Sequence, residues 1–430
     1  MAKIQTPVPV WLDCDPGHDD VFAILMAAYH PAIQLLGVSA VYGNASLKHT
    51  LWNATSILTA ISKDKDIPVY AGAARPIQRP PMGASADIHG ETGLDGTDLL
   101  PEPRVPAKST DLDTTLAAMA AALEAQPAGT AWLVATGTLT NVALLFDKYP
   151  HLADHIAGLS IMGGAVGGGF TTAVSGEVDG KPRIGNRTAY AEFNILLDPE
   201  AAAQVFGNAR LARKTTLVPL DLTHLVLATA EVQDLLLHGP RSEGADATGE
   251  GSKSSSTSTT PEKTTAATTN ASAQAPVTAS GSEAFSSAAL HGQGKTKLRT
   301  MLVQLLNFFA DTYSKVFNIT AGPPLHDPIA VAAVLTGTDA EIPFVESAET
   351  ETNGSGTGGA AERFEVTVVT DGTTDEALAG KTETGRTVVK LLPPGSEGVR
   401  IPRSLDIPLF WRVLEECCTR ADAANAENGQ

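Results

Sequence analysis

The chain has 430 residues, of which 43% are hydrophobic and 18% charged, and its formal net charge is −18. This composition is typical of a globular protein with one large or two ordinary domains. The acidic excess argues against a nucleic acid or an anionic membrane as partner, because both repel negative charge.

The three cysteines, Cys14, Cys417 and Cys418, offer neither a disulfide framework nor the ligand spacing of a zinc site. No apolar run approaches membrane-spanning length. The first predicted strand begins at Val8, which leaves no room for a signal peptide. We therefore expect a soluble, cytoplasmic protein.

The first predicted elements are a buried strand over 8–12 and a helix over 21–29, joined by an acidic turn. Asp13 and Asp15 are two positions apart, so they point to the same side of an extended chain. Pro16-Gly17 then turns the chain. Asp19 and Asp20 follow in the first turn of the helix, where the helix dipole favours negative charge.

This acidic turn predicts a metal site. Several carboxylates in one partly buried place cannot all stay ionised without a cation. Oxygen ligands without a Cys or His cluster suit a hard divalent ion, Ca²⁺ or Mg²⁺. The alternative is that single aspartates cap the helix and the others lie on a solvated face. Four carboxylates that straddle a strand, a turn and a helix favour the metal site.

Strands and helices continue to alternate along the chain. This pattern predicts an α/β fold with a mostly parallel central sheet flanked by helices. Ligands of such sheets bind outside the carboxyl ends of the strands, which gives weight to Asn44 and Thr136 there. The expected strands are 33–41, 68–71, 131–136, 159–162 and 215–221, and the expected helices are 47–61, 111–125, 142–149, 227–239, 298–316, 329–335 and 410–418, with a peripheral hairpin of 363–369 and 387–392.

Three stretches interrupt this pattern, at 166–185, 239–288 and 346–361. The first is rich in Gly, and the second is mostly Ser, Thr, Gly and Ala, a composition that buries too little apolar surface to fold. Because strands and helices resume after each insertion, we expect one domain over 8–420, followed by a polar tail over 421–430.

Several polar residues are ambiguous when taken singly. Asn186, Glu192 and Asn194 surround Phe193 and offer donors and acceptors suited to a polyol such as ribose, but an ordinary polar loop explains them equally well. His89 lies in a Pro- and Gly-rich loop, where a histidine is more often on the surface.

Two further signals are equally open. The carbonyl of Thr136 could ligate a cation, although Thr-Gly commonly just ends a strand. Asp327 before Pro328 is by itself an ordinary helix cap.

Taken together and in order, the motifs resemble those of the inosine–uridine-preferring nucleoside hydrolases over about 8–420. Each motif is modest, but the ordered set is highly specific. The motifs are Asp13-Cys-Asp-Pro-Gly-His-Asp-Asp20, Tyr42-Gly-Asn44, Ile88-His-Gly-Glu91, Thr136-Gly-Thr-Leu-Thr-Asn141, Ile161-Met-Gly-Gly164, Ala191-Glu-Phe-Asn194, Asp221-Leu-Thr-His224 and His326-Asp-Pro328.

The resemblance implies a single α/β domain that binds Ca²⁺ and hydrolyses the N-glycosidic bond of a ribonucleoside of the inosine and uridine class, in nucleoside salvage. The implied calcium ligands are Asp15, Asp20, the Thr136 carbonyl and Asp327, with water completing the shell. Asp13 would orient these ligands. The residues implied on the substrate side are Asp13, Asn44, His89, Met162, Asn186, Glu192, Phe193, Asn194 and Tyr313. Members of the family are commonly dimers or tetramers.

The chemistry fits these residue types. Breaking a ribosyl C–N bond builds positive charge on the sugar, which nearby carboxylates stabilise. A divalent ion lowers the pKa of bound water, and Asp19 is the expected base. His326 is the candidate acid for the leaving base. We also predict Asn44 to be a catalytic residue, together with Asp19 and His326.

Two other functions remain open at this point. Phosphotransferases of the haloacid-dehalogenase type also carry Asp-x-Asp at a strand end, but they have Thr or Val where this chain has Gly17. A non-catalytic nucleoside-binding protein would keep the pocket. This chain keeps all four motif aspartates and His326, which argues against a protein that has lost catalytic activity.

Overall fold

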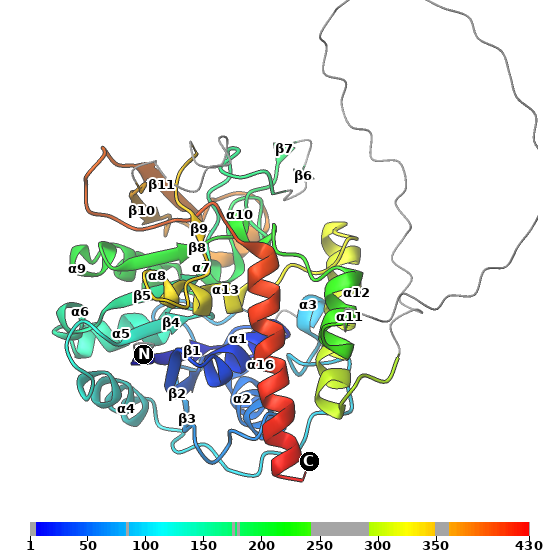
Figure 1. Cartoon of the computed structure of the whole chain (residues 1–430). Helices are drawn as coiled ribbons and strands as arrows, with labels where there is room; N and C mark the ends of the chain where they lie inside the picture. The colour runs from blue at the N-terminus through cyan, green and yellow to red at the C-terminus, as the bar shows by residue number, and fades with distance from the viewer. Residues whose placement is uncertain are drawn as a thin grey trace, which may run out of the picture.

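The computed structural model describes residues 6–82, 86–173, 177–178, 181–241, 292–348 and 361–429. Six parallel strands form the central sheet, with β1 near its middle (Figure 1). In spatial order the strands are β3 (Val69–Ala71), β2 (Ile33–Ala40), β1 (Val8–Cys14), β4 (Trp132–Ala135), β5 (Gly158–Met162) and β8 (Thr215–Val218).

Two layers of helices cover the two faces of this sheet. Alternate residues of β1 enter opposite cores: Val10 and Leu12 pack in one, and Trp11 in the other. The first layer holds α1 (Asp20–Tyr29), α2 (Leu47–Ala60), α11 (Ala230–His238), α12 (Lys297–Phe317), α13 (Asp327–Ala332) and α16 (Ile407–Glu427). The second holds α4 (Leu112–Glu124), α5 (Thr140–Lys148), α6 (Leu152–His155), α8 (Pro199–Phe206) and α9 (Ala209–Ala212).

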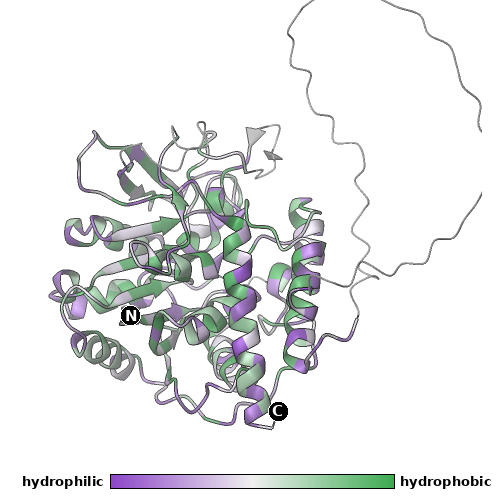
Figure 2. Ribbon diagram, in the orientation of Figure 1, coloured by the Kyte–Doolittle hydropathy of each residue, from purple (hydrophilic) through white to green (hydrophobic). Residues whose placement is uncertain are grey.

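The predicted α/β fold is therefore confirmed. Figure 2 shows hydrophobic residues along the strands and a mixture of both kinds on the outer helices, as expected for strands buried on both faces. None of the helices in the described ranges is long and apolar enough to cross a membrane.

The remaining described elements lie around the ends of this sandwich. They are α3 (Ala86–His89), α7 (Phe193–Leu197), α10 (Leu220–Thr223), the 3₁₀ helix η3 (Ala333–Leu335), α15 (Thr374–Leu378) and the antiparallel pairs β6 (Glu177–Val178) with β7 (Lys181–Pro182), β9 (Phe344–Val345) with β12 (Ser404–Leu405), and β10 (Phe364–Val368) with β11 (Thr387–Leu391). The last pair is the predicted hairpin.

Two of the differences between predicted and observed element boundaries affect a site motif and the end of the chain. The strand predicted over 215–221 ends at Val218, so Asp221 lies in α10 and not at a strand end. Pro219 explains the difference, because proline has no N–H for the sheet and suits the start of a helix. The closing helix α16 continues to Glu427, so the predicted tail at 421–430 is helical over most of its length.

The added turns of α16 are anchored. Arg299 of α12 is fully buried and pairs with Asp422 at 2.5 Å and Glu415 at 2.8 Å.

Of the predicted insertions, most of 239–288 and of 346–361 lies outside the described residues. The insertion at 166–185 is described at both ends and carries β6 and β7.

Strand register brings the polar ends of three strands together. Asp13 of β1 pairs with Ser39 of β2 on one side and with Ala135 of β4 on the other. The residues that follow these strands therefore meet at one edge of the sheet, as expected for a parallel fold.

Candidate active site

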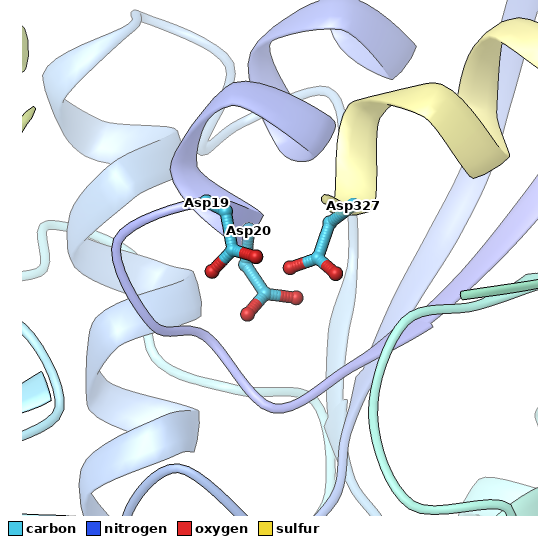
Figure 3. Close-up of side chains that lie close together, drawn as sticks. All are labelled: Asp19, Asp20 and Asp327. Atoms are coloured by element: carbon cyan, nitrogen blue, oxygen red, sulfur yellow. The ribbon is translucent and has the colours of Figure 1, made fainter. Parts of the chain in front are cut away.

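Three carboxylates meet at this edge. Asp20 begins α1 and Asp19 precedes it at the N-cap position, Asp327 begins α13, and the two helices pack against each other. One carboxylate oxygen from each residue lies within 4.8 Å of the other two, and all three side chains are buried (Figure 3). The N-termini of both helices point their dipoles at this cluster, which favours negative charge there.

Asp15 lies beside the cluster and is tightly enclosed. Its Oδ2 accepts a hydrogen bond from the backbone N–H of Asn44 at 2.8 Å. A Cβ atom on Gly43 would lie 1.9 Å from Oδ2, and one on Gly137 would lie 2.7 Å from Oδ1. Both glycines are therefore required for Asp15 to occupy its position.

The donor set fits a hard cation. Oδ1 of Asp15 and Oδ1 of Asp19 are buried and have no hydrogen-bond partner among the described residues. Buried polar atoms are almost always paired, so carboxylate oxygens without a protein partner at one place suit the binding of a hard cation. Residues of this cluster are thus able to hold a metal ion.

The electrostatics agree. Burial raises the pKa of Asp19 to about 8 and that of Asp20 to about 6. Burial, with the charge of neighbouring carboxylates, also raises the pKa of Asp15 and Asp327 well above the usual range. A bound divalent cation would reverse this effect, because it stabilises the ionised carboxylates.

Asp13 lies behind the cluster. It is fully buried, accepts a hydrogen bond from Asn141 Nδ2 at 2.7 Å and another from the Ser39 hydroxyl, and burial raises its pKa to about 7. These bonds tie β1, β2 and α5 together beneath the site. The position suits the orienting role predicted for Asp13, and not direct contact with substrate.

Thr136 contacts the cluster through its hydroxyl and the cavity wall through its carbonyl. Its hydroxyl donates to Asp20 Oδ1 at 2.8 Å, and its carbonyl accepts from Asn194 Nδ2 at 2.9 Å. A carbonyl oxygen has two lone pairs, so this bond leaves one for a cation.

A cavity of about 260 Å³ opens above these residues. The predicted residues that line it are Asp19, Asn44, His89, Thr136, Met162, Asn186, Glu192, Phe193, Asn194, Tyr313, His326 and Asp327. The other three predicted residues, Asp13, Asp15 and Asp20, are buried and absent from this lining.

One wall is built by the start of α7. Glu192 caps this helix, accepting from the backbone N–H groups of Asn194 at 2.9 Å and Ile195 at 3.1 Å, and it also accepts from Gly164 at 2.9 Å. Asn186 Oδ1 accepts from the N–H of Phe193 at 2.9 Å. Hydrogen bonds therefore hold this wall in place, and the Asn186 side chain also hydrogen-bonds the Tyr313 hydroxyl.

Another part of the lining is aromatic. His326 is buried, with its Nε2 2.8 Å from the Tyr313 hydroxyl and its Nδ1 2.6 Å from the Thr223 hydroxyl. Burial holds the pKa of His326 well below its usual range. Phe309 and Phe317 flank Tyr313, which makes this end suitable for a planar ring.

Sequence reasoning missed two arginines of the cavity lining. Arg183 lies over the Phe317 ring at 5.3 Å from its centre, and Arg187 pairs with Asp87 at 3.1 Å. Both are in or next to the Gly-rich insertion, where no periodic pattern indicated their direction. Thr223 was visible only as part of the Asp221–His224 motif.

Comparison with known proteins identifies this arrangement. Residues 10–412 match the family of inosine-uridine preferring nucleoside hydrolases. The chain belongs to this family. It is therefore a ribonucleoside hydrolase, an enzyme that cleaves N-glycosidic bonds.

Individual relatives agree. The chain is 32% identical to the uridine nucleosidase of Saccharomyces cerevisiae over 419 residues, 96% of this chain and 97% of that protein. It is 39% identical to the pyrimidine-specific ribonucleoside hydrolase RihA of Salmonella arizonae, over 53% of this chain and 65% of that protein. In structure it is similar to the purine-preferring ribonucleoside hydrolase from Gardnerella vaginalis, with a TM-score of 0.65, 21% identity and coverage of 96% and 99%. This last likeness concerns the fold.

The enclosure of Asp15 yields a first prediction. We expect Gly43→Ala to weaken metal binding about tenfold or more, because displacing Asp15 costs roughly 1–3 kcal/mol and 1.4 kcal/mol is a factor of ten. Calorimetric titration with Ca²⁺ measures the effect. Gly292→Ala is the matched control, since its Cβ would meet nothing closer than 3.8 Å. If Gly43→Ala binds metal as tightly as the wild type does, Gly43 is not required for the position of Asp15.

Proposed function

We propose that this hydrolase acts on ribonucleosides of the uridine and inosine class with Ca²⁺ as its resident cation. Asp15, Asp20, Asp327 and the Thr136 carbonyl would hold the ion. The observation that carries the proposal is the convergence of buried carboxylates, with unpartnered oxygens, on the floor of a cavity of about 260 Å³. All the donors are oxygens, which suits Ca²⁺ better than zinc or another soft metal.

When bound, the ion would lower the pKa of a water molecule and hold ribose hydroxyls. The protein supplies the remaining chemistry. Asp19 lines the cavity, so its carboxylate is the group placed to accept the proton of the attacking water. The carboxylates of the floor also stabilise the positive charge that develops on the ribose ring.

Different residues of the lining would take the two halves of a nucleoside. Asn44, Asn186 and Asn194 supply amide groups for the ribose at the carboxylate end. The nucleobase would lie against the rings of Phe309 and Tyr313. His326 stays the predicted acid for the leaving base, and it would act through its hydrogen bond with the Tyr313 hydroxyl.

A substrate panel tests this function. Ribose release from uridine, inosine, cytidine and adenosine is measured by a reducing-sugar assay, with chelator and after Ca²⁺ is added back. We expect release from uridine or inosine that the chelator abolishes and Ca²⁺ restores. A generic phosphate ester serves as the control for phosphotransferase chemistry, and we expect it to remain intact.

Two results would contradict the proposal. Nucleoside binding without release of ribose would indicate a non-catalytic binding protein. Hydrolysis that is indifferent to chelator would separate the reaction from the carboxylate cluster. The uridine nucleosidase relative makes uridine the first substrate to test.

A further inference from the structure

Two arginines lie beside the aromatic part of the cavity lining. The guanidinium carbon of Arg183 is 5.3 Å from the centre of the Phe317 ring, and Phe317 packs beside Tyr313 with 4.9 Å between the ring centres. Arg187 also lines the cavity and pairs with Asp87 at 3.1 Å. Positive charge therefore lies at the part of the cavity where the nucleobase would bind.

The hydrogen bonds of Arg183 hold its guanidinium in place and leave donors unused. Nε donates to the carbonyl of Gly185 at 2.7 Å, and Nη2 donates to the carbonyl of Asn186. A guanidinium has five N–H groups, so three remain, two of them on Nη1. Within the described ranges these three have no hydrogen-bond partner, and no carboxylate forms an ion pair with Arg183. Its charge is thus available to a ligand.

Arg187 adds a further unused donor. Its Nε is buried and has no hydrogen-bond partner in the part of the chain that the structure describes, whereas its Nη1 donates to Asp87. Buried donors are almost always paired, so this N–H suits an acceptor on a ligand. Burial and the positive charge of Arg187 both lower the pKa of Arg183, and an anion beside the two guanidinium groups would offset that repulsion.

A pyrimidine leaving group needs such a cation more than a purine does. When the C1′–N1 bond of uridine breaks, the electron pair stays with the base, and negative charge spreads over N1 and the two carbonyl oxygens. A purine has a free lone pair on N7, which an acid such as His326 can protonate. In uridine N1 is bonded to ribose and N3 carries a hydrogen, so no ring nitrogen offers a free lone pair. The charge that develops on the oxygens must then be stabilised by donors placed beside them.

We propose that Arg183, assisted by Arg187, is a catalytic residue that donates hydrogen bonds to the carbonyl oxygens of a departing pyrimidine and stabilises the base as an anion. In this step the C1′–N1 bond breaks, the water oxygen bonds to C1′, and Asp19 accepts the proton that the water loses. The base anion then takes one proton from solvent and leaves as neutral uracil. The inference rests on the proposed function and specifies how the site activates a pyrimidine.

The ionisation of a bound base tests the proposal without turnover. 5-Fluorouracil is more acidic than uracil, and ultraviolet difference spectra distinguish its neutral form from its anion. With ribose and Ca²⁺ present, we expect the wild type to lower the pH midpoint of this ionisation by about 1–2 pH units, the size of one charge-assisted hydrogen bond. Arg183→Gln should lose most of this change, and Arg183→Lys, which keeps the charge, should retain part of it.

Steady-state kinetics give the consequence for catalysis. We expect Arg183→Gln to lower kcat for uridine about 10–100-fold with little change in KM, because the negative charge develops only as the bond breaks. The loss should be smaller for 5-fluorouridine, whose base carries negative charge more readily. It should also be smaller for inosine, which has N7 available for protonation.

Arg386→Gln is the matched control. The Arg386 guanidinium is also 5.3 Å from the centre of an aromatic ring, that of Tyr190, but it pairs with Glu383 and is not part of the cavity lining. This variant should keep the wild-type kinetics and the wild-type ionisation of 5-fluorouracil.

Two results would overturn the proposal. One is a wild-type protein that leaves the ionisation of 5-fluorouracil unchanged. The other is an equal loss for uridine, 5-fluorouridine and inosine in Arg183→Gln, because it would reduce Arg183 to a support for the backbone at Asn186. Failure to hydrolyse any nucleoside would instead contradict the proposed function, and the spectroscopic titration would still decide whether Arg183 stabilises the anion.

Discussion

Asp19→Ala is expected to lower kcat by about 10²–10⁴-fold, the usual contribution of a general base, while the protein still binds its metal ion. Asp19 lines the cavity and has a buried Oδ1 without a partner in the described part of the chain. Asp20 lies deeper, where it accepts from the Gly17 N–H at 2.8 Å and from the Thr136 hydroxyl at 2.8 Å. The two neighbours are therefore placed for different roles. Steady-state kinetics and calcium titration of the same preparation measure both quantities.

Asp20→Ala is the matched variant. It should lose metal binding together with activity, because it removes a carboxylate from the centre of the cluster. Near-normal turnover in Asp19→Ala would remove Asp19 from the role of base. Loss of metal binding in Asp19→Ala would place it among the ligands, which its closeness to Asp20 and Asp327 permits.

Removing the metal should abolish turnover and also make the stability of the fold depend on pH. In the metal-free protein, burial raises the pKa of Asp13 to about 7, of Asp20 to about 6 and of Asp19 to about 8. The folded state then binds more protons than the unfolded state, whose carboxyl groups titrate near pH 4. The free energy of unfolding therefore falls as the pH rises from about 4 to about 8.

Thermal unfolding with chelator and with Ca²⁺ tests this expectation. We expect a chelator to lower Tm by several degrees at pH 8 and by much less at pH 5, where most of these carboxyl groups are protonated in the folded state. A bound cation neutralises the cluster and should flatten the pH dependence. A Tm that is indifferent to chelator at pH 8 would show that the buried carboxylates do not hold an ion.

Most of the fold was predictable because its signals are local. Alternating strands and helices indicate a parallel sheet, and a parallel sheet places its ligands at the carboxyl ends of the strands. Asn44 and Thr136 could be selected on that basis alone. The end of β8 was predicted wrongly, because the apolar run continues past Pro219 while the hydrogen-bonding capacity of the backbone does not.

The site was less predictable where its contacts join distant segments. No spacing in the sequence indicates that Thr223 reaches His326, or that Arg187 lies over the cavity beside Asp87. Glu192 could be recognised as a polar residue of the pocket, but its role as the cap of α7 depends on how the chain turns there. The identity of a residue is local information, whereas its direction depends on tertiary packing.

The carboxylate cluster also has a consequence for biosynthesis. Asp327 follows Asp20 by about 300 residues, so closing this contact carries the entropy cost of a very long loop. A nascent chain that has left the ribosome only as far as α12 already contains Asp19 and Asp20, but it lacks Asp327 and so does not have the complete set of carboxylates. A metal ion that needs all three carboxylates would therefore be captured late in maturation, only by chains whose amino- and carboxyl-terminal halves have docked correctly.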